Sequence, residues 1–166
     1  TALRFFIDTC FNQILMDSFK GSIMEKLFQV LRSRADFFPH QTALMTDAGD
    51  HQDIISNQQL WQKIASVTAV FTQEKVQCVG LYMDNCSEWV ICDLAAASLG
   101  ITLVPIPLSF TPAQVGHLAK SAQLDAIITK QASTLALNRV LKLPCVTVLN
   151  FFKICRKIYN KHGSKR

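Results

Sequence analysis

The chain has 166 residues, a length that fits one ordinary domain with a sizeable buried core. Its residues are 49% hydrophobic and 17% charged, and the mean hydropathy is +0.21. This composition excludes an intrinsically disordered chain, and the size removes any need for a disulfide-stapled miniprotein fold. The chain is also more apolar than a self-sufficient soluble domain usually is.

The net charge of +5 is concentrated at the C-terminal end. Residues 151–166 carry six basic side chains and no acidic one, so the rest of the chain has a net charge of −1. A basic tail can attract phosphate groups or anionic lipid. Because the body shows no basic stripe and no nucleic-acid motif, we expect a solvated basic tail and no specific nucleic-acid partner.

Neither a membrane-spanning helix nor a signal peptide is expected. The longest weakly charged stretch, 90–108, contains Asp93 and is interrupted by Gly100, Pro105 and Pro107. The first residues lack a basic segment followed by a continuous apolar core. The six cysteines form no CxxC or CxxH pair, which suits a reducing compartment and predicts a cytoplasmic location; they are Cys10, Cys78, Cys86, Cys92, Cys145 and Cys155.

Two helices are expected before residue 38, separated by Gly21 and Ser22. The apolar face of the first is formed by Phe5, Phe6, Cys10, Phe11, Ile14 and Leu15. The apolar face of the second is formed by Leu27, Phe28, Val30, Leu31 and Phe37.

A short hairpin and a long helix are expected next. The segments 43–46 and 53–55 flank the turn-forming residues 47–50. Ser56 and Gln59 have the spacing of a capping box, which predicts a helix of about four turns after them.

From residue 76 onwards, strands and helices alternate at short spacing. The expected strands are 76–83, 101–106, 125–129 and 145–149. The expected helices are one from an Asn85 or Ser87 cap to Leu99, one from Thr111 to Ala122, and one over 132–141. This order predicts an α/β fold with a mostly parallel sheet and crossover helices, with the hairpin outside that sheet.

The sequence nominates no catalytic, cofactor-binding or metal-binding residue. None of its six glycines forms a GxGxxG or P-loop motif, and the four histidines, His40, His51, His117 and His162, are scattered. Asp84 and Lys130 each follow an expected strand, as in a phospho-receiver domain, but no acidic pair follows the first strand, so Asp84 is interpreted as a turn residue. Ser87 lacks the flanking glycines of a nucleophile elbow.

Four ordered blocks go beyond this generic pattern. They are Ile55–Leu60, Cys78–Trp89, Leu94–Ile106 and Phe110–Pro112. In order and spacing they resemble the opening of the adenylate-forming (AMP-binding) superfamily, which includes acyl-CoA synthetases, luciferases and peptide-synthetase adenylation domains. The resemblance covers roughly 27–129, and Pro107, where peptide-synthetase domains often have aspartate, favours the acyl-CoA synthetases.

The resemblance implies an incomplete N-terminal part of the adenylate-forming fold. Intact members use ATP and Mg²⁺ to activate a small carboxylate, for instance in fatty acid metabolism, and pass the acyl group to a thiol, usually coenzyme A. Their Pro-Lys-Gly phosphate loop and Tyr-Gly-x-Thr-Glu segment do not occur here. We therefore expect a truncated ligase, inactive alone and with no cofactor of its own, although the sequence leaves its enzyme status and oligomeric state open.

The expected organisation is an extension over 1–26, a partial ligase domain over 27–149 and a basic tail over 150–166. A second hypothesis from another class is a non-catalytic α/β interaction module, in which an apolar sheet edge pairs with a partner and the basic tail adds attraction.

Overall fold

A computed structural model describes residues 23–47, 52–129 and 145–147. Its main sheet has four strands in the order β4-β3-β5-β6, and all three pairings are parallel. The strands are β3 (Cys78–Tyr82), β4 (Thr102–Pro105), β5 (Ala126–Thr129) and β6 (Cys145–Thr147). The helices are α2 (Ile23–Phe37), α3 (Asn57–Gln73), α4 (Ser87–Leu99) and α5 (Pro112–Ser121). The predicted parallel α/β sheet is confirmed.

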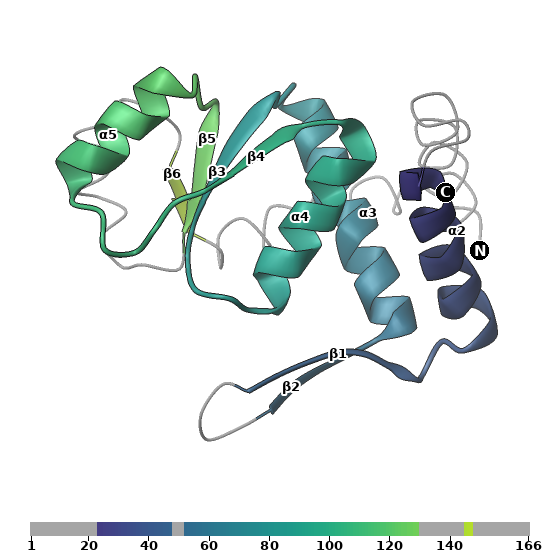
Figure 1. Ribbon diagram of the computed structural model, residues 1–166. Helices are drawn as coiled ribbons and strands as arrows, with labels where there is room; N and C mark the ends of the chain where they lie inside the picture. Colours follow the sequence, from purple (N-terminus) through teal and green to yellow (C-terminus); the bar gives the residue numbers. More distant parts are fainter. Residues whose placement is uncertain (1–22, 48–51, 130–144, 148–166) are drawn as a thin grey trace, which may run out of the picture.

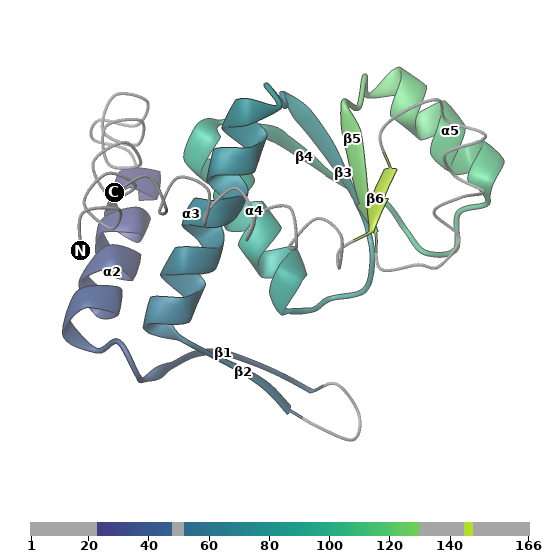
Figure 2. The same ribbon diagram turned by 180° about the vertical axis from the view of Figure 1, so that it is seen from behind.

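The sheet lies between two helical layers. Figures 1 and 2 show α3 and α4 on one side and α5 on the other. Along β3, Val79 and Leu81 pack into the core with α3 and α4, whereas Tyr82 packs into a second core with Val115 of α5. This alternation follows from the two-residue period of a strand, and it makes β3 a central strand buried on both faces.

Gly80 leaves room for the side chains that pack against β3 in the core with α5. A Cβ atom at Gly80 would lie 2.8 Å from the Cδ1 atoms of both Ile106 and Leu124. Any larger residue would therefore push these side chains outward.

The predicted hairpin is also confirmed. Strands β1 (Thr42–Asp47) and β2 (Gln52–Ser56) form a separate antiparallel sheet beside α3. Figure 1 shows the hairpin extending below the helices, away from the four-stranded sheet. A two-stranded sheet is marginal alone, so its position depends on contacts with α3 and α4.

Two predicted helix starts carry the expected caps. At α3 the Ser56 hydroxyl accepts from the Gln59 N–H at 3.3 Å, and the Gln59 side chain accepts from the Ser56 N–H at 3.0 Å. Thr111 and Gln114 form the same capping box at α5, with Pro112 in its first turn. Gly100 ends α4 with φ of 66°, as its expected left-handed role requires.

Two details of the predicted helices are wrong. In α2 the five expected face residues do not share one environment, because Phe28 is buried and Leu31 half-buried whereas Leu27, Val30 and Phe37 are exposed. At α4 the N-cap is Cys86, not Asn85 or Ser87, and its side chain makes no capping hydrogen bond. The expected helices within 1–20 and over 132–141 lie outside the described residues.

Candidate functional site

The sheet has one topological switch point. From β3 the chain crosses through α4 to β4 on one side, and it then returns through α5 to β5 on the other side of β3. In open α/β sheets, ligands bind at such a point, outside the carboxyl ends of the two diverging strands. Here those ends are Tyr82 and Thr129, which are register partners. The carboxyl ends of β3 and β5 are thus the candidate location for a ligand site.

The tyrosine at this edge has a structural role. The Tyr82 hydroxyl donates to the carbonyl oxygens of Phe110 at 3.1 Å and Leu108 at 3.4 Å, so it holds the loop between β4 and α5. Asp84 follows in an exposed loop before α4. Lys130, which would complete a phospho-receiver pair, lies outside the described residues.

Ser87 lies in a partly buried polar cluster between the hairpin and α4. Its hydroxyl donates to Asp53 Oδ2 at 2.7 Å, and Thr46 Oγ1 lies 3.0 Å from Ser87 Oγ. Asp53 and Thr46 are cross-strand partners in the hairpin, and Ser87 is 1% exposed. The cluster therefore joins β1 and β2 to the first turn of α4, and the serine proton is already held by a carboxylate.

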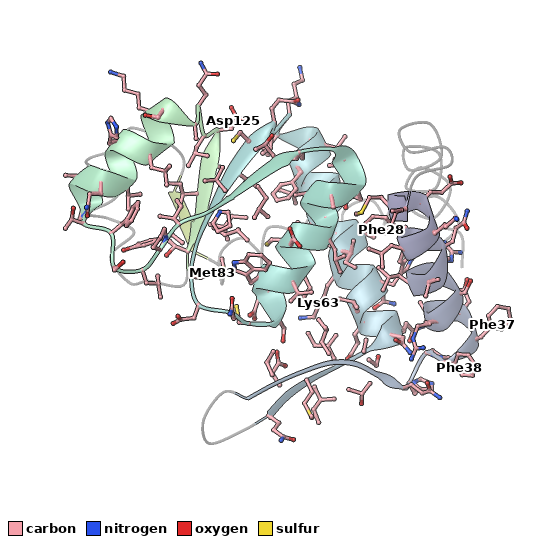
Figure 3. The ribbon with its side chains drawn as sticks, viewed as in Figure 1. Phe28, Phe37, Phe38, Lys63, Met83 and Asp125 are labelled. Carbon is pink, nitrogen blue, oxygen red and sulfur yellow. The ribbon has the colours of Figure 1, made fainter. Side chains whose placement is uncertain are left out.

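A second carboxylate lies at the opposite end of the sheet. Asp125 Oδ2 accepts from the backbone N–H groups of Gln77 at 2.7 Å and Cys78 at 2.9 Å, which ties the start of β5 to that of β3. Figure 3 shows Asp125 and Met83 at opposite ends of the sheet. Burial, and secondarily the Asp125 charge, raises the pKa of the Cys78 thiol, so this cysteine is a poor nucleophile.

Within the described ranges, no three His, Cys, Asp or Glu side chains are grouped closely enough to hold a metal ion. His40 and His117 are exposed, as expected of His117, whereas His51 and His162 fall outside those ranges. Cys78, Cys86 and Cys92 form no disulfide. No helix of the described part is long and apolar enough to cross a membrane.

An open hollow of about 610 Å³ lies against the outer face of α5. It is mostly apolar and is lined by Phe110, Ala113, Gln114, His117, Leu118 and Ser121. His117 is the one titratable side chain among these six residues, so the hollow offers no paired acid and base.

The chain resembles known proteins in both sequence and fold. A family model described as "AMP-binding enzyme" matches residues 31–161. The chain belongs to the AMP-binding enzyme family. The match extends beyond residue 149, so it includes part of the segment that the sequence analysis assigned to the basic tail.

A curated relative in this family is a crotonobetaine/carnitine–CoA ligase from Shigella sonnei (strain Ss046). It is 27% identical over 118 residues, which cover 69% of this chain and 22% of the ligase. The present chain therefore spans about a fifth of the length of that relative.

Solved structures show the same fold. VinN superimposes with a TM-score of 0.69 at 15% identity, covering 83% of this chain and 35% of VinN. ATP-bound MatB from Rhodopseudomonas palustris superimposes with a TM-score of 0.65 at 18% identity, covering 78% of this chain and 27% of MatB. The predicted resemblance to part of an adenylate-forming fold is thus confirmed.

The blocks that carried this resemblance have structural positions. Ile55–Leu60 contains the cap of α3, Cys78–Trp89 contains β3 and the start of α4, and Leu94–Ile106 contains the end of α4 and β4. Ser87 contributes a polar cluster that sequence reasoning missed in them. The sequence did not indicate that Thr46 and Asp53 of the hairpin contact Ser87, because this contact depends on tertiary packing.

Proposed function

We propose that this chain forms the N-terminal part of an AMP-forming acid–thiol ligase. Such an enzyme joins a small carboxylate to AMP and then transfers the acyl group to coenzyme A. The observation that carries the proposal is the family match over 31–161, which spans the sheet with its switch point and the blocks that form β3, α4 and β4. The CoA ligase from Shigella sonnei supports coenzyme A as the acceptor.

The described residues do not fit ATP and Mg²⁺ by themselves. Mg²⁺ binding to nucleotide phosphates uses one or two carboxylates, and phosphates need convergent N–H or cationic donors. At the switch point, Asp84 is an exposed loop residue and the Tyr82 hydroxyl is directed to backbone carbonyls. We therefore propose that these residues are a scaffold, inactive in adenylation alone.

A reducing cytoplasm is the compartment we propose for this scaffold. The support is chemical: Cys78, Cys86 and Cys92 form no disulfide, and Cys92 is completely buried in the core with α3 and α4. Free thiols persist where glutathione keeps them reduced.

The activity of the isolated chain is tested by carboxylate-dependent exchange of pyrophosphate into ATP. We expect no exchange with a panel of short, branched and long carboxylates. ATP binding should be weak, should vanish at high ionic strength, and should be lost when residues 151–166 are deleted. Exchange that survives this deletion would overturn the proposal of an inactive scaffold.

The ligase assignment has its own test in the coding sequence downstream of residue 166. We expect it to encode, in frame or after a frameshift, the Ser/Thr/Gly-rich loop ending in Pro-Lys-Gly. A downstream sequence without this loop would contradict the ligase assignment whatever the exchange assay shows.

The alternative, an interaction module that pairs through a sheet edge, is disfavoured at β4. The N–H groups of Thr102 and Ile106 donate inward, to Gln77 and Leu81, so the alternate positions 103 and 105 face outward. Residue 105 is proline and has no N–H, which leaves Leu103 as the outward donor of this strand. A proline on an edge strand is a common obstacle to strand addition.

A further inference from the structure

The loop between β3 and α4 brings two sulfur atoms together. The Cys86 thiol lies 3.8 Å from the Met83 thioether and donates a weak hydrogen bond to it. Met83 is 6% exposed and belongs to the core with α3 and α4, whereas Cys86 is half-buried. Figure 3 shows Met83 where the chain leaves β3 toward α4. The loop thus carries a thiol that solvent reaches, backed by a buried thioether.

The regular elements on either side of this loop position the two sulfur atoms. Met83 directly follows β3, and Cys86 directly precedes α4 as its N-cap residue. The side chain of Cys86 makes no capping hydrogen bond, but its carbonyl oxygen accepts from the N–H groups of Trp89 at 3.1 Å and Val90 at 3.3 Å. The backbone of Cys86 is therefore tied to the first turn of α4, while its sulfur is directed toward Met83.

We propose that Met83 and Cys86 form a binding site for a soft monovalent metal ion, Cu(I). Thiolate and thioether sulfur are the ligands that select Cu(I), whereas Mg²⁺ and Ca²⁺ take oxygen ligands. On binding, the thiol proton of Cys86 is released to solvent and both sulfur atoms coordinate the ion, whose oxidation state does not change. The choice of Cu(I) over Cu(II) rests on the reducing compartment proposed above.

The distance between the sulfur atoms fits a shared ion. Two sulfur atoms that each lie about 2.3 Å from one ion stand about 3.8 Å apart at a tetrahedral angle and about 4.0 Å apart at a trigonal angle. The observed separation is 3.8 Å, so binding needs little movement of either side chain. A linear arrangement would require about 4.6 Å, so the geometry favours a third ligand from solution, either water or a small thiol.

The surroundings of Cys86 also favour the form of sulfur that binds metal. The thiolate, not the thiol, is the metal ligand. Cys86 stands at the N-terminus of a 13-residue helix, where the helix dipole stabilises a negative charge. Asp84 and Asn85, which separate the two sulfur residues, are exposed and leave the approach from solvent open. A bound ion would link the end of β3 to the start of α4, beside the candidate location for a ligand site.

The test titrates the full chain with Cu(I) supplied as its bicinchoninate complex under anaerobic conditions. Loss of the colour of this complex measures the Cu(I) that the protein takes up. Because the chain has other cysteines, the readout is a difference between variants. Wild type should take up one Cu(I) per chain more than Cys86→Ser, and a tenfold excess of Zn(II) should not displace that ion.

Met83→Leu tests the thioether separately. This substitution conserves the volume of the side chain and removes its sulfur, so the fold should be kept. Loss of even an outer-shell partner costs about 10–100-fold in metal affinity, so we expect Cu(I) to bind at least about tenfold more weakly.

Cys78→Ala is the matched control, because Cys78 is a half-buried cysteine at the other end of β3. It should leave the affinity of the Met83–Cys86 site within about twofold of wild type. Trp89, three residues after Cys86, supplies a local readout. Its fluorescence should be quenched by Cu(I) in wild type and in Cys78→Ala, but not in Cys86→Ser.

Three results would overturn the proposal. Equal affinity in Met83→Leu and wild type would mean that Cys86 binds as a solitary thiol. An equal loss of Cu(I) in Cys78→Ala and Cys86→Ser would mean that any thiol of the chain takes up the ion. Displacement by Zn(II) would assign the pair to a different metal. None of these results depends on pyrophosphate exchange, so the metal site and the proposed ligase function can fail separately.

Discussion

The central sheet and the periphery of α2 and the hairpin use apolar residues differently. In the sheet, Val79, Leu81 and Ile127 are almost completely buried because helices cover both faces. In the periphery, Met45 and Ile54 form a cross-strand pair and are 62% and 54% exposed. Sequence periodicity marks a residue as apolar on one face, but it does not tell whether another element covers that face.

The largest expected effect separates the two regions directly. Ile127→Ala removes a fully buried side chain of β5 from the core with α5 and should lower the free energy of unfolding by about 2–5 kcal/mol. Ile54→Ala in the hairpin should change it by less than about 0.5 kcal/mol. Urea unfolding followed by the fluorescence of Trp61 and Trp89 measures both. Equal losses would show that the hairpin face is covered in solution.

The next largest loss of stability is expected at the contact that connects the hairpin to α4. Ser87→Ala leaves the Asp53 carboxylate without its 2.7 Å donor and should cost about 2 kcal/mol. Asp53→Ala should cost a similar amount, and the double variant should cost little more than either, because the two groups act as one contact. Fully additive losses in urea unfolding would contradict this coupling.

The sheet could be predicted from the sequence because local signals agree with the tertiary environment there. The run around β3 is apolar on both faces, and Gly100 and Thr111-Pro112 give unambiguous helix ends. The loops entering β3 and β5 gave weaker signals. Both use a non-glycine residue at positive φ, Lys75 and Gln123, each with φ of 53°. Neither position is a glycine, so the sequence does not reveal the positive φ. The buried residues that follow hold this backbone conformation.

The sequence alone did not locate the candidate site. The motifs that hold ATP in the family do not occur in the sequence, and sequence analysis accordingly nominated no site residue. The Ser87 cluster escaped prediction because Thr46 and Asp53 are separated from Ser87 by 41 and 34 residues. Such a contact depends on how the hairpin packs, and no local pattern encodes that.

A smaller effect sharpens the comparison at the helix ends. Thr111→Ala should cost about 1 kcal/mol, because it removes the capping hydrogen bond of α5. Cys86→Ser should raise the stability by up to about 1 kcal/mol, since Cys86 has extended N-cap geometry but supplies no cap. Thermal unfolding measures both shifts. A destabilised Cys86→Ser would show that the contact of the Cys86 thiol with Met83, at 3.8 Å, outweighs a cap.

The smallest effect is a pH dependence at the start of β3. Burial, followed by the charge of Asp125, raises the pKa of Cys78 above its ordinary value of 9.0. Above that pH the unfolded chain loses the thiol proton while the folded chain still holds it, so the folded state binds more protons. The stabilisation is therefore fully present below pH 9.0 and decreases as the pH rises through the folded pKa. Between mildly and strongly alkaline pH, the urea midpoint should fall more for the wild type than for Cys78→Ala. The variant lacks the thiol but keeps the other groups that titrate at alkaline pH. Parallel profiles for the two proteins would mean that Cys78 titrates alike in the folded and unfolded chains, and that the Asp125 contact holds the backbone without affecting the thiol.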